Sequence, residues 1–206
     1  MTTKLQYLGH SSFLLTADNG WKCVFDPYAD DSVPGLKLPE VTADDVVVSH
    51  GHSDHNAVHL VKRQEPKMPC PYTITVLKTD HDDQQGVLRG ENDITVLKSD
   101  QEKIVHCGDL GRKLTLQEIE ALCQADAIMI PCGGYYTIDA STVRDMIEAI
   151  RPKLTVLMHY RRGDVGYDVL SSLDDVCAII PNVQILKQTE VEIGAITGVV
   201  ALDPRQ

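Results

Sequence analysis

The sequence has no apolar run long enough to cross a membrane, since a spanning helix needs about 20 consecutive apolar residues. The residues from Met1 onward lack the basic stretch, apolar stretch and cleavage site of a secretory signal. The six cysteines lie far apart and form no Cys-x-x-Cys pair, which argues against a cysteine-based zinc site and against a disulfide framework. We therefore expect a cytoplasmic protein with reduced thiols and no membrane span.

Basic residues are also scarce. The chain has 19 Lys and Arg against 30 Asp and Glu, which gives a net charge of −11 at pH 7. Binding of nucleic acid depends on basic side chains that neutralise phosphates, so no nucleic-acid partner is expected, and Arg161-Arg162 is the best candidate for a local basic site. We expect a small-molecule substrate instead, and the sequence leaves open whether the protein forms a homo-oligomer.

The chain has no internal repeat, no low-complexity run and no Gly/Ser-rich linker, so we predict a single domain over residues 1–206. Short β-branched or apolar runs bounded by Gly, Pro, Asp or Asn predict strands. These strands are Leu5–Leu8, Ser12–Thr16, Lys22–Phe25, Val46–Ser49, Thr73–Leu77, Ile94–Leu97, Lys103–Cys107, Ala127–Ile130, Leu154–Met158, Val183–Leu186, Val191–Ile193 and Gly198–Leu202.

Two helices are expected in the second half of the chain. Thr115-Leu116-Gln117-Glu118 is a capping-box pattern, which predicts a helix to about Cys123. Asp139 can cap a second helix, whose apolar residues recur at helical spacing before Pro152. Runs of strands, then alternation with helices, then strands again indicate an α/β protein of the α+β type, with two sheets and helices packed outside them.

Three of the eight histidines fall within six residues, in the segment Ser49-His50-Gly51-His52-Ser53-Asp54-His55-Asn56. This segment follows a predicted buried strand, and the ends of strands are where open α/β sheets usually build their sites. Neutral imidazoles and a carboxylate suit zinc and similar divalent metals. One loop can therefore offer His50 and His52 to one ion, and Asp54 and His55 to a neighbouring ion. A solvated histidine-rich loop is the alternative.

The pattern His-x-His-x-Asp-His resembles the signature of the metallo-β-lactamase superfamily. Other motifs extend the resemblance along nearly the whole chain, toward the branch with lactonase-like and phospholipase-D-like Zn-dependent hydrolases. They are Leu8-Gly9-His10-Ser11-Ser12-Phe13, Asp26-Pro27, Thr79-Asp80-His81-Asp82-Asp83 with Arg89-Gly90-Glu91-Asn92, His106-Cys107-Gly108-Asp109-Leu110-Gly111, Pro131-Cys132-Gly133-Gly134-Tyr135-Tyr136-Thr137 and Met158-His159-Tyr160. The resemblance implies a four-layer αβ/βα sandwich of two mixed β-sheets with helices on the outer faces.

The resemblance also implies a site for two divalent metal ions, zinc in the first place and manganese as the alternative. One ion would be bound by His50, His52 and His81, and the other by Asp54, His55 and His159, with Asp109 bridging the two. His81, Asp109 and His159 each follow a β-rich run, so the residues themselves point to the same edge of the fold. An exposed loop histidine is the alternative interpretation of His81.

Several further residues are candidates for contact with the substrate or with the metal ligands. In the resembling family the loop of His10 lines the metal pocket, and a buried structural histidine is the alternative. Asp26 could accept a hydrogen bond from a ligand histidine, or serve only as a turn residue before proline. His106 is expected beside the ligands rather than among them, because of strand alternation. The remaining candidates for substrate contact are Tyr135, Tyr136 and Tyr160.

The implied reaction is hydrolysis of a lactone, ester, amide or phosphodiester by a hydroxide that bridges the two metals. Asp54 would bind a metal and also orient or accept the proton of the nucleophile, and His10 is the second catalytic candidate. Two alternatives stay open: a non-catalytic metal-binding module, and an iron-dependent relative that reduces oxygen or nitric oxide. The iron branch generally has a carboxylate where His52 stands. The short gap between His55 and His81 indicates an open site, or one completed by another subunit.

Overall fold

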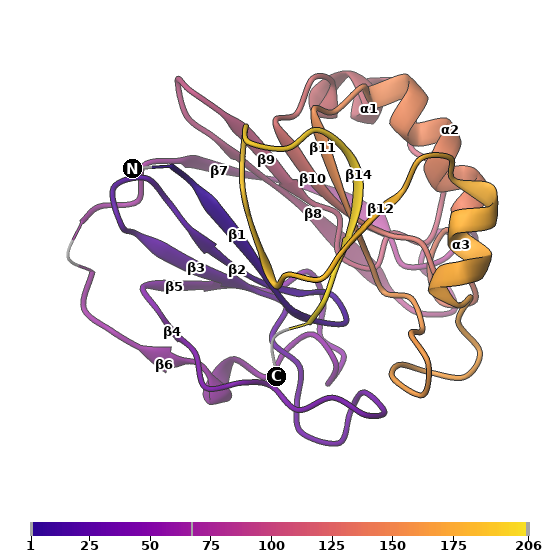
Figure 1. Ribbon diagram of the computed structural model, residues 1–206, viewed down its shortest axis with the longest axis horizontal. Coiled ribbons are helices and arrows are strands. Elements are labelled where there is room, and N and C mark those ends of the chain that lie inside the picture. Colours follow the sequence, from indigo (N-terminus) through magenta and orange to yellow (C-terminus); the bar gives the residue numbers. More distant parts are fainter. Residues whose placement is uncertain (1, 67, 205–206) are drawn as a thin grey trace.

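The computed structural model describes residues 2–66 and 68–204, and its strands form two main sheets (Figure 1). The first sheet runs in the order β13-β1-β2-β3-β5. Its strands are β1 (Lys4–Gly9), β2 (Ser12–Thr16), β3 (Lys22–Phe25), β5 (Asp45–Val47) and β13 (Glu190–Glu192). Strands β1, β2 and β3 are antiparallel neighbours and β5 is parallel to β3, so this sheet is mixed.

The second sheet runs in the order β12-β14-β11-β10-β9-β8-β7. Its strands are β7 (Thr73–Asp80), β8 (Glu91–Lys98), β9 (Lys103–His106), β10 (Ala127–Pro131), β11 (Leu154–Met158), β12 (Gln184–Leu186) and β14 (Gly198–Leu202). Strands β9, β10, β11, β14 and β12 are parallel, whereas β7 and β8 join at one edge as an antiparallel pair. The predicted α+β class with two mixed sheets is therefore confirmed.

The two sheets pack face to face through one apolar core. Leu5 and Tyr7 of β1 point into this core, and so do Ala127 and Met129 of β10 from the other sheet. Because side chains alternate along a strand, the intervening residues face outward. Strands that are buried on both faces read as continuous apolar runs, which is why the sequence shows no alternation of polar and apolar residues in β10.

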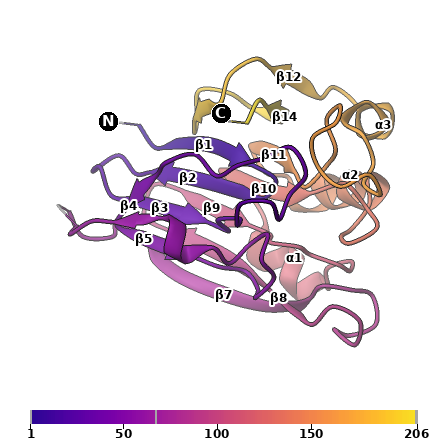
Figure 2. The ribbon, with the colours of Figure 1, turned by 90° about the horizontal axis from the view of Figure 1, so that it is seen from below.

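The helices lie together over the outer face of the seven-stranded sheet (Figures 1 and 2). They are α1 (Leu116–Leu122), α2 (Ala140–Ile150) and α3 (Leu173–Ile179). The outer face of the five-stranded sheet is covered instead by residues 28–43 and by the β4–β6 ribbon, which pack on Leu8, Leu14 and Val24. In that covering, β4 (Thr42–Ala43) pairs in parallel with β6 (Lys62–Arg63), and the short 3-10 turn η1 (Val58–Leu60) directly precedes β6.

The helix ends follow the capping patterns of the sequence. The Thr115 side chain accepts a hydrogen bond from the Glu118 amide, and Glu118 accepts one from the Thr115 amide at 2.7 Å, so the predicted capping box is confirmed. Asp139 caps α2 by accepting from the Thr142 amide at 2.8 Å. Ser172 precedes helix α3 as its N-cap and forms a second capping box with Asp175, and this helix was not predicted from the sequence.

Strand direction brings many strand ends to one edge of the sandwich. The antiparallel pairings β1–β2 and β2–β3, with the parallel pairing β3–β5, make β1, β3 and β5 run in the same direction. The pairings of the second sheet likewise align β7, β9 and β11. The residues that follow these six strands therefore lie along the same edge of the sandwich, in one row for each sheet. No helix in the described part of the chain is long and apolar enough to span a membrane.

Candidate metal centre

Each predicted metal ligand directly follows, or lies in the loop after, one of these aligned strands. The loop after β5 carries the cluster that starts at His50, and His81 follows β7. Asp109 lies just beyond β9, and His159 is the first residue after β11. The described side chains that could hold a metal ion fall into three overlapping groups at this edge.

The first group consists of His50, His52 and His81. One ring nitrogen from each lies within 4.8 Å of the others. The ring centres of His50 and His52 are 4.7 Å apart, and those of His50 and His81 are also 4.7 Å apart. These are the three residues that the sequence analysis assigned to one ion. His52 is the exposed member, while His81 is buried.

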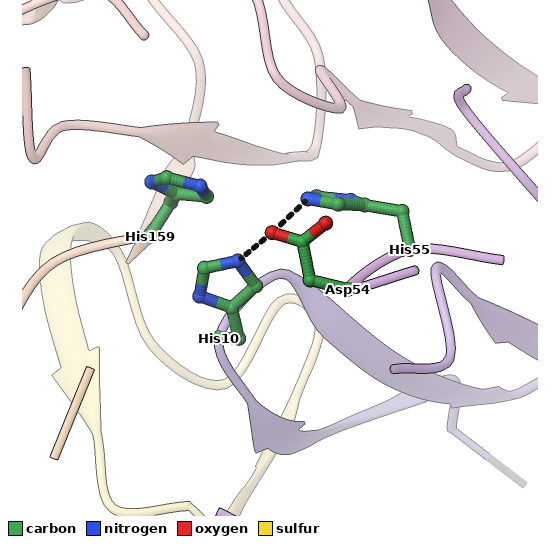
Figure 3. A group of neighbouring side chains, drawn as sticks. All are labelled: His10, Asp54, His55 and His159. Carbon is green, nitrogen blue, oxygen red and sulfur yellow. Dashed lines mark ion pairs between the residues drawn. The ribbon is translucent and has the colours of Figure 1, made fainter. Parts of the chain in front are cut away.

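The second group consists of Asp54, His55 and His159, and the structure adds His10 to it. Figure 3 shows the Asp54 carboxylate between the rings of His10 and His55. Asp54 Oδ2 lies 3.3 Å from His10 Nε2 and 3.8 Å from His55 Nε2. His10 therefore lies against the ligand set rather than apart from it, at the tight connection between β1 and β2.

Asp109 lies between the two groups. Its Oδ2 atom is 3.1 Å from Nε2 of His55 and 3.1 Å from Nε2 of His159 in the second group. The same oxygen is 3.5 Å from Nε2 of His81 in the first group. Asn92 fixes the backbone here by accepting a hydrogen bond from the Asp109 amide at 2.8 Å. Asp109 therefore lies within reach of ring nitrogens from both groups.

Unpartnered buried atoms show that these residues fit metal ions. The Nε2 atom of His50 and the Oδ1 atom of Asp109 are buried and have no hydrogen-bond partner among the described residues, and the Nε2 atoms of His55 and His159 share the single Oδ2 atom of Asp109 at 3.1 Å each. A buried polar atom without a partner costs about 1–3 kcal/mol, so several in one place are unfavourable unless a ligand satisfies them. Imidazole nitrogens and carboxylate oxygens together are a donor set for zinc and similar divalent cations.

The backbone at this edge is strained. His10, Asp26 and His159 adopt left-handed φ angles of 54°, 43° and 55°, which residues with a Cβ rarely adopt. Each such residue costs about 1–3 kcal/mol and persists where the surroundings require it. Gly108 has a φ of 53°, and a Cβ there would lie 2.4 Å from Cβ of Ser49. Only glycine lets the loop before Asp109 approach the histidine loop so closely.

Asp26 supports both ligand groups from behind. Its Oδ2 atom lies 2.9 Å from Nδ1 of His55, a ligand of the second group. Ser49 donates its hydroxyl to the same oxygen at 2.6 Å, and that hydroxyl oxygen lies 2.9 Å from Nδ1 of His50, a ligand of the first group. Burial alone would raise the pKa of Asp26, but His106 and His55 hold that pKa below its usual value, so Asp26 is a carboxylate at neutral pH.

We expect Asp26→Asn to weaken metal binding by about 10–100-fold, the usual cost of losing a residue that orients metal ligands. Ser49→Ala should have a smaller effect, because it breaks the contact with His50 and leaves the contact with His55. Competition with a chromophoric chelator measures both affinities. Asp45→Asn is the control, since Asp45 bonds to Trp21 and Arg63 outside the site. Unchanged affinity in Asp26→Asn would show that Asp26 only shapes the turn.

Burial sets the protonation of several histidines. It lowers the pKa of His50 to about 3, and with the charge of His159 it lowers the pKa of His10 to about 4. Burial would also lower the pKa of His55, but Asp109 and Asp26 raise it well above its usual value. For Asp54, burial opposes the charge while contact with His10 and the charge of His55 keep the pKa low. His50 and His10 are therefore neutral at pH 7, which is the state in which the His50 ring can bind a metal.

The remaining predicted site residues are placed as follows. His106 stacks on Phe25, and both of its ring nitrogens are engaged, by the carbonyl of Ser11 at 2.8 Å and the amide of Gly108 at 3.2 Å. Tyr136 lines the cleft over the metal centre, whereas Tyr135 is 65% exposed and does not line it. Tyr160 is buried in the core beneath the helices, away from the cleft.

The cleft has a volume of about 350 Å³ and opens onto both ligand groups. Two residues that the sequence analysis did not select contribute to it. The Tyr167 hydroxyl lies 3.2 Å from Asp54 Oδ2 and 2.6 Å from the carbonyl of Ser32. Arg89 lies at the cleft with its guanidinium 5.5 Å from the centre of the Tyr136 ring. Nothing in the sequence around Tyr167 indicates a site residue. Arg89 belongs to one of the motifs quoted above, but that motif does not by itself indicate a role for its side chain.

Comparison with known proteins agrees with this geometry. The pattern of the β-lactamase superfamily domain matches residues 4–159. A metal-dependent hydrolase of Archaeoglobus fulgidus is 27% identical, over 76% of this chain and 83% of that protein. One of Thermoplasma acidophilum is 24% identical, over 88% of this chain and 96% of that protein. A Thermotoga maritima structure described as a Zn-dependent hydrolase of the metallo-β-lactamase superfamily is 26% identical, with a TM-score of 0.76 and coverage of 98% and 100%.

The fold, the histidine and aspartate groups and the match over most of the sequence agree on one family. The chain belongs to the metallo-β-lactamase superfamily. Within that superfamily it is a metal-dependent hydrolase. The predicted family and enzyme class are thus confirmed.

Proposed function

We propose that the protein hydrolyses a lactone, ester, amide or phosphodiester bond of a small substrate with two divalent metal ions. The observation that carries this proposal is the pair of ligand groups joined by Asp109, whose Oδ2 lies within 3.5 Å of ring nitrogens from both. His50, His52 and His81 would hold one ion, and Asp54, His55 and His159 the other. Histidine-rich ligation favours zinc, with manganese as the alternative.

Two such ions, when bound, supply a hydroxide nucleophile at neutral pH and polarise the oxygen on which charge develops. The side chains of the chain position and move protons around that chemistry. Burial opposes the charge of Asp54, but contact with His10 and the charge of His55 lower its pKa, so the carboxylate stays ionised at neutral pH and can accept a hydrogen bond from the nucleophile. His10 holds Asp54 from one side at 3.3 Å, and Tyr167 contacts the same oxygen from the other at 3.2 Å. We assign Asp54 the role of a metal ligand that orients the nucleophile, and His10 that of holding Asp54 in place.

Turnover of an aryl ester, a lactone and bis(4-nitrophenyl) phosphate by metal-replete and metal-depleted protein tests the proposal. The expected result is metal-dependent hydrolysis of at least one class, lost in His55→Ala and kept in His59→Ala. His59 is the matched control because it lies in the turn after the same loop, is exposed and belongs to none of the ligand groups. Bound metal without turnover of any class would favour a non-catalytic metal-binding module.

The buried cysteines are expected to contribute packing rather than chemistry. Cys132 is fully buried beneath the helices, and burial raises the pKa of its thiol, so it is not a thiolate nucleophile at neutral pH. We expect Cys132→Ser to lower the free energy of unfolding by about 1–3 kcal/mol, the cost of burying a hydroxyl, and to leave turnover intact. Thermal melting and turnover measure the two effects, with the half-buried Cys123→Ser as control. Loss of turnover with unchanged metal content would point to a thiol mechanism.

A further inference from the structure

One charged side chain at the cleft takes no part in the metal groups. Among the cleft-lining residues, Asp54 and Asp109 belong to the ligand groups, and Arg89 is the third charged side chain. Arg89 lies between His81, which follows β7, and the start of β8, so its loop connects directly to a ligand of the first group. Arg89 is therefore placed where it can contact a substrate in the cleft and is not one of the candidate metal ligands.

The loop that carries Arg89 is held by a single buried carboxylate. Asp82 is 2% exposed, and its Oδ1 atom accepts hydrogen bonds from the amides of Gln84 and Gly86 at 2.8 and 2.9 Å. Its Oδ2 atom accepts from the amides of Leu88 and Arg89 at 2.9 and 2.8 Å. Hydrogen bonds to an ionised group are roughly twice as strong as neutral ones, so four of them fix the loop backbone. Arg89 thus projects from a preorganised base, which lowers the entropy cost of binding.

The guanidinium of Arg89 has no carboxylate partner in the described part of the chain. Its contact is with the face of Tyr136, 5.5 Å from the ring centre, and Tyr136 in turn packs edge-on against Tyr167. Arg112 provides the contrast within the same protein, since it bonds to Asp80 at 2.6 Å and to Glu118 at 2.8 Å. Stacking on an aromatic ring orients a guanidinium and leaves its N–H donors free for a ligand.

We propose that Arg89 binds an anionic group of the substrate, a carboxylate or a phosphate, while the bond to be cleaved lies at the metal centre. The planar fork of five N–H donors matches the paired oxygens of either group. This inference rests on the proposed function only for the location of the metals. It narrows the substrate to a molecule that carries a permanent negative charge in addition to the hydrolysable bond.

Calorimetric binding to metal-replete protein tests the proposal without turnover. The probes are malonate, succinate, glutarate and adipate, each compared with the monocarboxylate of equal chain length, and phosphonoacetate and 3-phosphonopropionate as the phosphate-like arm. A ligand with two anionic ends can reach the metals and Arg89 together, whereas a monocarboxylate reaches one of them. We expect at least one dianion to bind about tenfold more tightly than its monoanionic counterpart, a difference that high salt reduces.

The variants assign that preference to Arg89. Arg89→Gln should remove the preference, so that the dianion binds about as tightly as its monocarboxylate counterpart, and Arg89→Lys should keep part of the preference. Arg144→Gln is the control, because it removes one positive charge from the exposed surface of α2, where Arg144 pairs with Asp145. The two kinds of probe, dicarboxylates and phosphonates, are then compared. The kind whose affinity falls more in Arg89→Gln identifies the anionic group that Arg89 binds. Absence of any preference in the wild type, or an undiminished preference in Arg89→Gln, would overturn the proposal. Failure of every ester, lactone, amide and phosphodiester to react would reject the proposed function and leave this binding result standing.

Discussion

Asp109→Ala is expected to lower the metal content of the protein below two ions per chain and to reduce turnover by more than the roughly 10–100-fold typical of losing a residue that only supports a ligand. The reason is that one carboxylate oxygen of Asp109 faces His55, His81 and His159 within 3.5 Å, so both ligand groups share it. The fold should survive, because the Asp109 side chain lies outside the apolar clusters. The hydrogen bond to Asn92 is donated by the backbone amide of residue 109, so the substitution does not remove it.

Elemental analysis, circular dichroism and turnover measure these three outcomes on the same preparation. Asp93→Ala is the matched control, because Asp93 is also an acidic residue beside this edge but pairs with Lys78 and belongs to no ligand group. Two metals per chain and wild-type turnover in Asp109→Ala would mean that Asp109 does not bridge the groups. Loss of secondary structure would instead mean that the carboxylate is needed for folding.

The candidate ligand set could be proposed from the sequence because its chemistry is local. Three histidines and an aspartate crowd one loop, and His81, Asp109 and His159 each follow an apolar run that reads as a strand. Strand direction then determines that these ends meet, which a single sequence does not state but the resemblance to the superfamily implied. The structure brings the candidate ligand atoms together in the two proposed sets, adds His10 to one of them, and places His50, His55 and Asp109 in a third group that links the two.

The residues that escaped prediction, or were placed differently, depend on contacts distant in sequence. Tyr167 reaches Asp54 across 113 positions of the chain, and nothing near it in sequence marks that contact. Tyr160 follows His159, whose left-handed backbone turns the chain so that the next side chain enters the core. Helix α3 was missed because its capping box closes with Asp175 instead of the Glu or Gln of the usual pattern, which marked the equally short α1.

The segment that covers the outer face of the five-stranded sheet could also not be predicted from the sequence. The resemblance implied helices on both outer faces, whereas residues 28–43 cover this face largely as irregular chain. Apolar residues such as Val33, Leu38 and Val41 are spaced irregularly there, so periodicity could not indicate what they cover. Tyr28 ties this segment down by donating its hydroxyl to the carbonyl of Leu8 at 2.8 Å. Packing against the sheet, rather than local propensity, determines this segment.

Thermal stability and turnover are expected to fall together as the pH drops below about 6, and a strong chelator at neutral pH should cause the same losses. The pKa of His50 is lowered to about 3 and that of His10 to about 4, against 6.5 for an unperturbed histidine. Below pH 6.5 these histidines therefore become protonated in the unfolded chain but stay neutral in the folded protein. The free energy of unfolding consequently falls as the pH drops from 6.5 to about 4. The lowered pKa values of Asp26 and Asp109 add a further loss at more acid pH.

His55 acts in the opposite sense, because its raised pKa contributes stability that is present below pH 6.5 and lost as the pH rises through its folded pKa. Bound metal removes this opposing contribution, since His55 must be neutral to bind metal. Metal also makes the loss of stability at acid pH steeper, because protons compete with it for the other histidines. Metal at about 1,000 times its dissociation constant stabilises by about 4 kcal/mol per site, on the order of 10 °C in a chain of this size. Melting curves from pH 8 to pH 4, with added zinc or manganese and with chelator, decide the matter. The metal-dependent gain should be largest near neutral pH, shrink below pH 6, and persist in His59→Ala but not in His55→Ala. A melting temperature that responds to neither metal nor chelator would make these histidines ordinary residues of a surface loop.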